Sequence, residues 1–455
     1  MSGSEGGTDR KVTFGEVFGV AEFRAVFATT LLAEIGDFMS KAAVTALVFF
    51  VTDSVPLAAA AFAVSYAPWA VGGPLLTALA DRLPYRAVMV TSDALRAAII
   101  SLVAVVAVTL LPSTTAAAAD GVPPAIWLII SLLFLESLLA PPALAARSAI
   151  LPLMLEGDRV TLGIALSQTG RQGAQVSGYM AGALIAITDP AIALAINAAI
   201  YALNALIVRL GVRHRPPALS AEQRGHLLHE TTEGFRVVFG TPTLRAIAIV
   251  VFALMLFSIV PEGLAIGWAE ELTEDDPARR GLYQGLILIA HPLGSVLAAL
   301  LIVRLLRPAV RTRLVRYFAV AAPLALVPAV LEPGVAVVVA MTMISGMVLA
   351  GTLPTLNGIF VQILHHGYRA RAFGVMNSGM QILQGGAVLA VGAIVGIGVL
   401  PLPVVVGLWS AAGVVLMLVL TSRWPSADVF TDAIASAQAA NQAALADAEK
   451  RTVTQ

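Results

Sequence analysis

Several ionisable side chains stand inside long apolar runs of this sequence, where a charge is costly and needs a partner. Five are acids, three are bases and one is an imidazole: Glu34, Asp37, Asp93, Glu136, Glu262; Lys41, Arg96, Arg171; His291. Burial favours the neutral form of a carboxyl group and a nearby cation favours the ionised form, so such acids can load and release protons. We therefore expect proton coupling or binding of a charged solute, with static salt bridges as the alternative.

The first apolar run places three of these groups on one helix face. Glu34, Asp37 and Lys41 are spaced at i, i+3 and i+7. Residues four apart can pair directly, so we expect an Asp37–Lys41 ion pair that leaves Glu34 as the less compensated acid.

The other buried groups lack a cation nearby on their own helix. Glu136 and Glu262 must each meet a cation from another helix or stay protonated, and both are candidates for the wall of a cavity. Arg171 either anchors an anionic group or neutralises an acid. His291 is expected to pack rather than to relay protons. Asn377 and Gln381 share a helix face with Gln384 and are expected to face the same cavity.

The composition explains which elements must hold these residues. Of the 455 residues, 58% are hydrophobic and 12% are charged, about half the charge of a soluble domain. A membrane helix needs about 20 apolar residues, and the chain offers twelve such stretches. We therefore predict an all-α membrane protein with spans near 24–50, 57–80, 86–111, 124–147, 160–187, 190–210, 245–269, 281–303, 314–331, 334–363, 371–399 and 401–423.

The polar segments divide the chain and orient it. We expect a cytoplasmic segment 1–23, a six-helix bundle 24–211, a cytoplasmic linker 212–244, a second bundle 245–423 and a tail 424–455 that forms a loose helix in solvent. With both termini cytoplasmic, 23 basic residues fall inside and two outside, as the positive-inside rule requires.

Composition also excludes several classes. The net charge of zero argues against a nucleic-acid partner, and the absence of cysteine excludes disulfides and thiolate metal sites. No carboxylate supports the H-x-x-H of His226 and His229, so no metal site is expected. No phosphate-binding loop is present, which leaves a proton gradient as the energy source and no cofactor.

Short motifs carry a family resemblance. The loop GGPLLTALADRLPYRAVMV resembles the Gly-x-x-x-Asp-Arg-x-Gly-Arg-Arg signature of the major facilitator superfamily through Asp81, Arg82 and Arg86, with Thr77 and Pro84 in place of the two glycines. Three further segments are similar to elements of its drug- and siderophore-exporter branch: AEIGDFMSKAAV, the Asp93-x-x-Arg96 spacing and APPALAARSAILPLM. GYMAGA sits where exporters of this superfamily often show Gly-Pro-x-x-Gly-Gly. Gly178 and Gly182 match, whereas Tyr179 replaces the proline.

The resemblance implies two six-helix bundles related by a pseudo-two-fold axis, which rock about a midplane cavity. Gly178 and Gly182 would permit close helix packing. Six charged residues resemble an inner-gate network: Asp81, Arg82, Arg86, Asp93, Arg96 and Arg147.

The leading functional hypothesis is a monomeric exporter in the cell membrane that exchanges protons for small amphiphilic drugs or antibiotics. The chief alternative is a transporter of one metabolite, such as a siderophore, a self-made antibiotic or a lysophospholipid, with Lys41 and Arg171 as anion contacts. A non-transporting receptor is a third possibility. A membrane enzyme lacks a nucleophile–base or metal constellation.

Overall fold

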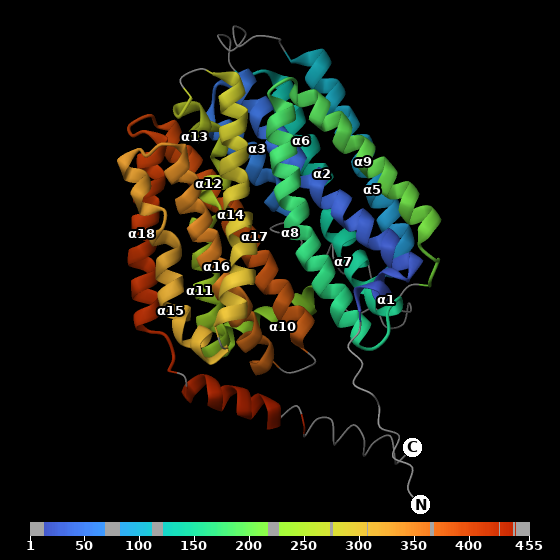
Figure 1. The fold of residues 1–455 in the computed structure, drawn as a ribbon, viewed down its shortest axis with the longest axis vertical. Helices are drawn as coiled ribbons and strands as arrows, with labels where there is room; N and C mark the ends of the chain where they lie inside the picture. Colours follow the sequence, from blue (N-terminus) through green and yellow to red (C-terminus); the bar gives the residue numbers. More distant parts are fainter. Residues whose placement is uncertain are drawn as a thin grey trace, which may run out of the picture.

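The computed structural model describes residues 13–68, 82–111, 122–216, 227–273, 276–306, 308–364, 368–426, 428–439 and 442. Within these ranges the secondary structure is helical and no strand occurs. The helices lie roughly side by side in two groups (Figure 1). The all-α membrane fold that the sequence predicts is confirmed.

The first group of helices covers the N-terminal half. A short α1 (Phe14–Phe18) precedes the long α2 (Ala21–Thr52). The remaining elements are α3 (Val55–Ala63) with the 3-10 turn η1 (Val64–Tyr66), α5 (Tyr85–Leu110), α6 (Pro124–Ser137), α7 (Ala140–Ile150) with η3 (Leu151–Leu153), α8 (Asp158–Ala186) and α9 (Pro190–Gly211).

The second group begins after a short helix, α10 (Leu227–Gly240), which packs against α17. Its elements are α11 (Pro242–Ser258), α12 (Val260–Gly263), α13 (Ala265–Glu271), α14 (Pro277–Leu305), α15 (Pro308–Leu324) with η5 (Val327–Leu331), α16 (Val335–Ile363), α17 (Arg369–Gly396) and α18 (Leu402–Ser422).

Ten helical segments of the described chain are long and apolar enough to cross a membrane. Two predicted spans fall outside this number for different reasons. The described part of the second span is the short apolar helix Val55–Tyr66, and residues 69–81 lie outside the description. α8 has 29 residues but carries many polar side chains, including Arg171 and three glutamines. The count of twelve spans therefore stays a prediction.

Proline interrupts two of the predicted spans. The fourth divides into α6 and α7 just before Pro141 and Pro142, and the seventh divides into α11, α12 and α13 around Pro261. Proline has no backbone N–H and its ring clashes with the preceding turn, so the helical hydrogen-bond ladder stops there. Both breaks lie beside a buried acid, Glu136 or Glu262.

The two halves meet near one end of the helices. We call the end where α2 begins and α18 ends the basal end, and the opposite end the distal end (Figure 1). Gly281 of α14 lies against Ile187, and Gly267 of α13 against Val55. The Gln284 amide donates to the carbonyl oxygen of Ala42 over 3.1 Å. These contacts lie in the distal third of the helices, so the two halves touch on the distal side.

Close packing of α2 on α8 depends on the two glycines of the exporter-like motif. A Cβ atom at Gly178 would lie 2.5 Å from the carbonyl oxygen of Ile35, and one at Gly182 would lie 2.8 Å from the Cα atom of Met39. Backbone atoms cannot yield as a flexible side chain can. A side chain at either position would therefore meet the backbone of α2.

The tail differs from its prediction as a loose solvent helix. Residues 428–439 are helical, and Phe430, 5% exposed, joins the core formed by α10, α11, α15 and α16. Its ring lies 5.3 Å from that of Trp424. Burial of the Phe430 ring and partial burial of Trp424 hold the segment against the basal end.

The glycine packing yields a matched test within one helix. Gly182→Ala should destabilise the protein by roughly 1–3 kcal/mol, because the new methyl group overpacks the α2–α8 contact. Gly173→Ala, on the same helix with no atom within 4 Å of the new Cβ, should be neutral or stabilising by up to about 1 kcal/mol. Denaturant titration in micelles would compare them, and equal effects would contradict this packing role.

Candidate functional site

A cavity of about 200 Å³ lies on the basal side of the contact between the halves. Its wall combines apolar side chains of α2, α6 and α7 with seven charged ones: Glu34, Asp37, Lys41, Arg96, Glu136, Arg147 and Arg171. α17 of the other half contributes Gln381. Most of the ionisable residues that the sequence singles out are therefore gathered around one space.

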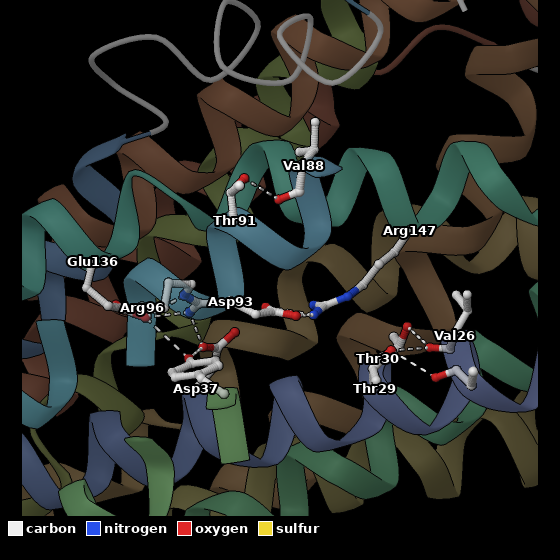
Figure 2. Close-up of polar contacts among 12 residues, drawn as sticks. Val26, Thr29, Thr30, Asp37, Val88, Thr91, Asp93, Arg96, Glu136 and Arg147 are labelled. Carbon is white, nitrogen blue, oxygen red and sulfur yellow. Dashed lines mark hydrogen bonds and ion pairs between the residues drawn. The ribbon is translucent and has the colours of Figure 1, made fainter. Parts of the chain in front are cut away.

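Arg96 of α5 is the centre of this cluster. It is 3% exposed and bonds two acids: Nε and Nη2 lie 2.7 and 2.6 Å from Glu136 Oε1, and Nη2 also pairs with Asp37. The Tyr201 hydroxyl of α9 donates to Asp37, and lies 3.2 Å from Glu136 Oε1. Figure 2 shows Arg96 between the two carboxylates. One guanidinium thus joins α2, α5 and α6 and serves two acids.

Two further ion pairs involve one acid and one base each. Arg171 of α8 pairs with Glu34 of α2. Arg147 of α7 holds both oxygens of the fully buried Asp93 at 2.9 and 2.7 Å, on the other side of the view in Figure 2. Of the two roles considered for Arg171, the structure thus shows neutralisation of an acid.

Lys41 differs from the expected arrangement. The predicted Asp37–Lys41 pair is wrong, because Asp37 pairs with Nη2 of Arg96 and accepts a hydrogen bond from the Tyr201 hydroxyl. Glu34 is likewise not the uncompensated acid, since Arg171 binds it. Among the described residues no carboxylate lies within 4.0 Å of the Lys41 ammonium, which instead lies 4.8 Å from the Phe38 ring centre and 5.0 Å from that of Tyr66.

The charges of the cluster balance only when Lys41 is counted. The four acids Glu34, Asp37, Asp93 and Glu136 face the four bases Lys41, Arg96, Arg147 and Arg171. Two pairs are complete, whereas Asp37 and Glu136 share one guanidinium. With both acids ionised, balance requires a further positive charge, and Lys41, on the next turn of α2 from Asp37, is the remaining base of the cavity wall.

Glu262 lies apart from this cluster, in the contact between the halves. Its Oε2 accepts a hydrogen bond of 2.7 Å from the Tyr179 hydroxyl of α8, and its Oε1 lies 3.3 Å from Nδ1 of His291 on α14. Glu262 is 4% exposed and is not part of the cavity wall. His291, expected as a packing residue, is thus in contact with a buried acid.

The structure divides the six residues grouped as an inner-gate network. Asp93 and Arg147 form one pair, whereas Arg96 belongs to the cavity cluster. Arg86 donates to the backbone carbonyl of Arg209 at the end of α9. Arg82 has a partner, and Asp81 lies outside the described residues. The gating role of these residues stays a hypothesis.

The polar residues of α17 do not share one environment. Gln381 lies on the cavity wall, Asn377 is exposed one turn nearer the basal end, and Gln384 contacts the sulfur of Met255 at 3.3 Å. Tyr201 was not singled out from the sequence. It lies four residues after Asn197 and three before Asn204, so these three residues share one face of an otherwise apolar helix. That polar face is the feature of the sequence that indicates Tyr201.

No three His, Asp or Glu side chains in the described ranges come together as a metal-binding group. The chemistry available to this cavity is therefore that of carboxylates, guanidinium groups, an ammonium group and hydroxyls. These groups can bind ions and transfer protons.

The sharing of Arg96 yields a test of stability. Arg96→Gln should cost roughly 3–5 kcal/mol, because it leaves two buried carboxylates without their cation. Arg171→Gln should cost less, since that side chain is 33% exposed and faces one acid. Adding Glu136→Gln to Arg96→Gln should recover part of the loss in denaturant titrations. Equal losses in the two arginine variants would contradict the central place of Arg96.

Comparisons with known proteins agree with this architecture. A nucleoside transporter, NupG, has a TM-score of 0.66 at 14% identity, with 89% of this chain and 99% of that chain covered. A POT family transporter in complex with 5-aminolevulinic acid gives 0.64 at 12% identity, covering 87% and 94%. No curated protein matches the sequence.

A bacterial homologue of the iron transporter ferroportin allows two states to be compared. Its inward-facing structure gives a TM-score of 0.64 at 14% identity, with 91% of this chain and 99% of that chain covered. Its outward-facing structure gives 0.56 at 16% identity, with 89% and 99% covered. At these identities the likeness concerns the fold alone.

The sequence itself matches the profile of the Major Facilitator Superfamily over residues 26–388. That range begins in α2 and ends in α17, and it includes every charged residue of the cavity wall. The chain therefore belongs to the major facilitator superfamily, whose transporter fold its helices adopt.

Proposed function

We propose that this membrane transporter is an antiporter that exports small amphiphilic molecules in exchange for protons. One observation carries the proposal: Asp37 and Glu136, on different helices of the cavity wall, share the single guanidinium of Arg96. Two carboxylates served by one strong cation can accept a proton at low cost, because protonation relieves the repulsion between them.

Charge balance links that proton to the substrate. With the pair ionised, the cluster is neutral only through Lys41. A proton on Asp37 or Glu136 leaves the cavity wall with an unbalanced positive charge, which repels a cation. Proton and cationic substrate therefore compete for the same site, as an exchange mechanism requires.

The cavity wall also suits an amphiphilic solute. Ala33, Val44, Leu133 and Leu144 line it together with the charged groups. A volume of about 200 Å³ is smaller than the roughly 300–1,000 Å³ of typical ligand pockets. Small molecules with an apolar body and one charged or polar group match this mixture best.

The distribution of basic residues supports a direction. The basal end, where α2 begins and α18 ends, corresponds to the cytoplasm under the positive-inside rule. With the distal contact closed, the cavity would then receive substrate from the cytoplasmic side. Rocking of the two halves about the cavity would carry it to the other face of the cell membrane.

Lys41 favours a second candidate, a transporter of one anionic metabolite. It is the cation of the described cavity wall that lacks a carboxylate within 4.0 Å. A carboxylate or phosphate of a substrate could take that place between Phe38 and Tyr66. Aromatic carboxylates should then inhibit transport saturably, and Lys41→Gln should abolish that inhibition. This result would support an anionic substrate over the export of cations.

Proteoliposomes under an imposed pH gradient test the exchange, with ethidium as a fluorescent amphiphilic cation. Asp37→Asn and Glu136→Gln should each reduce the gradient-driven accumulation of ethidium at least about ten-fold. A ten-fold change in this concentration ratio corresponds to about 1.4 kcal/mol. Each substitution removes one carboxylate charge and nearly preserves the shape of the side chain. Glu34→Gln should have a smaller effect, because Glu34 and Arg171 form a complete pair.

Glu332→Gln provides the matched control. It makes the same substitution in an exposed connection beyond η5, away from the cavity, and should transport as the wild type does. Accumulation against the gradient that persists in Asp37→Asn, Glu136→Gln and Glu262→Gln alike would exclude proton coupling through these acids.

A further inference from the structure

Tyr179 stands at a position where this chain departs from the exporter motif, and the structure shows what the tyrosine does there. The ring is fully buried and packs edge-on against Phe38 at 4.8 Å. Its hydroxyl crosses to the other half and donates to Glu262 over 2.7 Å. A proline at this position would have neither the ring nor the donor.

Glu262 is compensated differently from the acids of the cavity cluster. No Lys or Arg nitrogen of the described residues lies within 4.0 Å of its carboxylate, whose partners are the Tyr179 hydroxyl and the imidazole of His291. An ionised carboxylate at this depth depends on its hydrogen bonds. Here one of those hydrogen bonds is also a link between the two halves.

The groups facing Glu262 come from several elements. Lys41 of α2 and Tyr66 of η1 lie farther away than Tyr179 of α8 and His291 of α14. The other neighbours are apolar: α3 and the distal half of α11 carry no ionisable residue, and α17 places Val388 against Gly263. The titratable groups in direct contact here are therefore Glu262, His291 and the Tyr179 hydroxyl.

The strength of the link depends on the protonation of Glu262. A hydroxyl that donates to an ionised carboxylate makes a charge-assisted hydrogen bond, roughly twice as strong as a neutral one. A proton on Oε1 neutralises the acceptor. That proton can be donated to Nδ1 of His291, 3.3 Å away within the same half, when the neutral imidazole carries its own proton on Nε2. Protonation thus weakens the bond that crosses between the halves.

We propose that Tyr179, Glu262 and His291 form a distal gate that is held shut by the Tyr179–Glu262 hydrogen bond and released when Glu262 takes up a proton. The inference rests on the proposed antiport and deepens it. An antiporter must not change state when neither proton nor substrate is bound, because that step would dissipate the gradient. The gate prevents it, since the bond is strongest in the unprotonated, empty molecule.

Position links the distal gate to the cavity. Phe38 lines the cavity and contacts both the Tyr179 ring and the Lys41 ammonium, at 4.8 Å in each case. A substrate that displaces Phe38 or Lys41 therefore acts on the gate without reaching Glu262. Substrate and proton thus have separate routes to the same hydrogen bond.

The absence of native cysteine makes the distal end directly measurable. Spin labels introduced at Thr188 and Val399 would report the distance between the halves in lipid nanodiscs without substrate. Both residues are exposed, one after α8 and the other between α17 and α18. Tyr283→Phe, which removes a hydroxyl at the distal end of α14, is the control for Tyr179→Phe.

In the wild type, the population with separated distal ends should rise on going from mildly alkaline to mildly acidic buffer. Tyr179→Phe should raise that population about ten-fold in alkaline buffer and remove most of its response to pH. Glu262→Gln should do the same, and the double variant should add nothing further. Tyr283→Phe should follow the wild type.

The gate is overturned if Tyr179→Phe keeps the wild-type response of the distal distance to pH. It is also overturned if the effects of the two substitutions add in the double variant. If Tyr179→Phe does not fold, Glu262→Gln decides: a pH response that persists in it overturns the proposal. Ethidium exchange separates the two proposals. If the wild type exchanges ethidium but Tyr179→Phe leaves the distal distances unchanged, the gate alone is refuted. If the distances behave as expected but no ethidium is exchanged, the antiport alone is refuted.

Discussion

The cost of a charge in an apolar interior is the constraint on which this structure depends. Moving an ion from water into such a setting costs several kcal/mol unless partners compensate it. Arg96 meets that requirement by binding Asp37 and Glu136, and it thereby fixes the positions of α2, α5 and α6 around the cavity. The ion pairs of Arg147 and Arg171 do the same for α7 and α8. The ion pairs that compensate the buried charges therefore also set the positions of the helices.

Properties that depend on a single segment could be predicted from the sequence. Apolar length predicts the helices, and the charges inside them predict Glu34, Asp37 and Glu136 as cavity residues. Arg96, which the family resemblance assigns to the inner-gate network, lies on the cavity wall instead. The partners could not be predicted, because they depend on how helices rotate and approach. Asp37 and Lys41 are correctly spaced for a pair, yet Asp37 pairs with the guanidinium of Arg96 on a neighbouring helix, a contact that only the packed bundle reveals.

The hydrogen-bonding roles that the sequence does not reveal belong to residues that share one property. Tyr179 and Tyr201 are uncharged at neutral pH, so neither raises the cost of burial enough to be noticed in an apolar run. Each nevertheless donates to a buried carboxylate from another helix. The breaks at Leu138 and Pro261 were likewise hidden within spans of sufficient length, although proline marked them locally. Hydrogen-bond donors on neighbouring helices complete a charged site that acids and bases only outline.

The acids occupy two depths, and this separation has a mechanistic consequence. Asp37 and Glu136 line the cavity with a guanidinium between them, so a proton there changes the charge that a substrate meets. Glu262 lies in the contact between the halves, where a proton changes the bond that joins them. In the proposed exchange, the first position sets the affinity for the substrate and the second sets the conformation. An exchange mechanism needs both, since competition at the cavity without control of the contact would allow the empty molecule to change state and the gradient to dissipate.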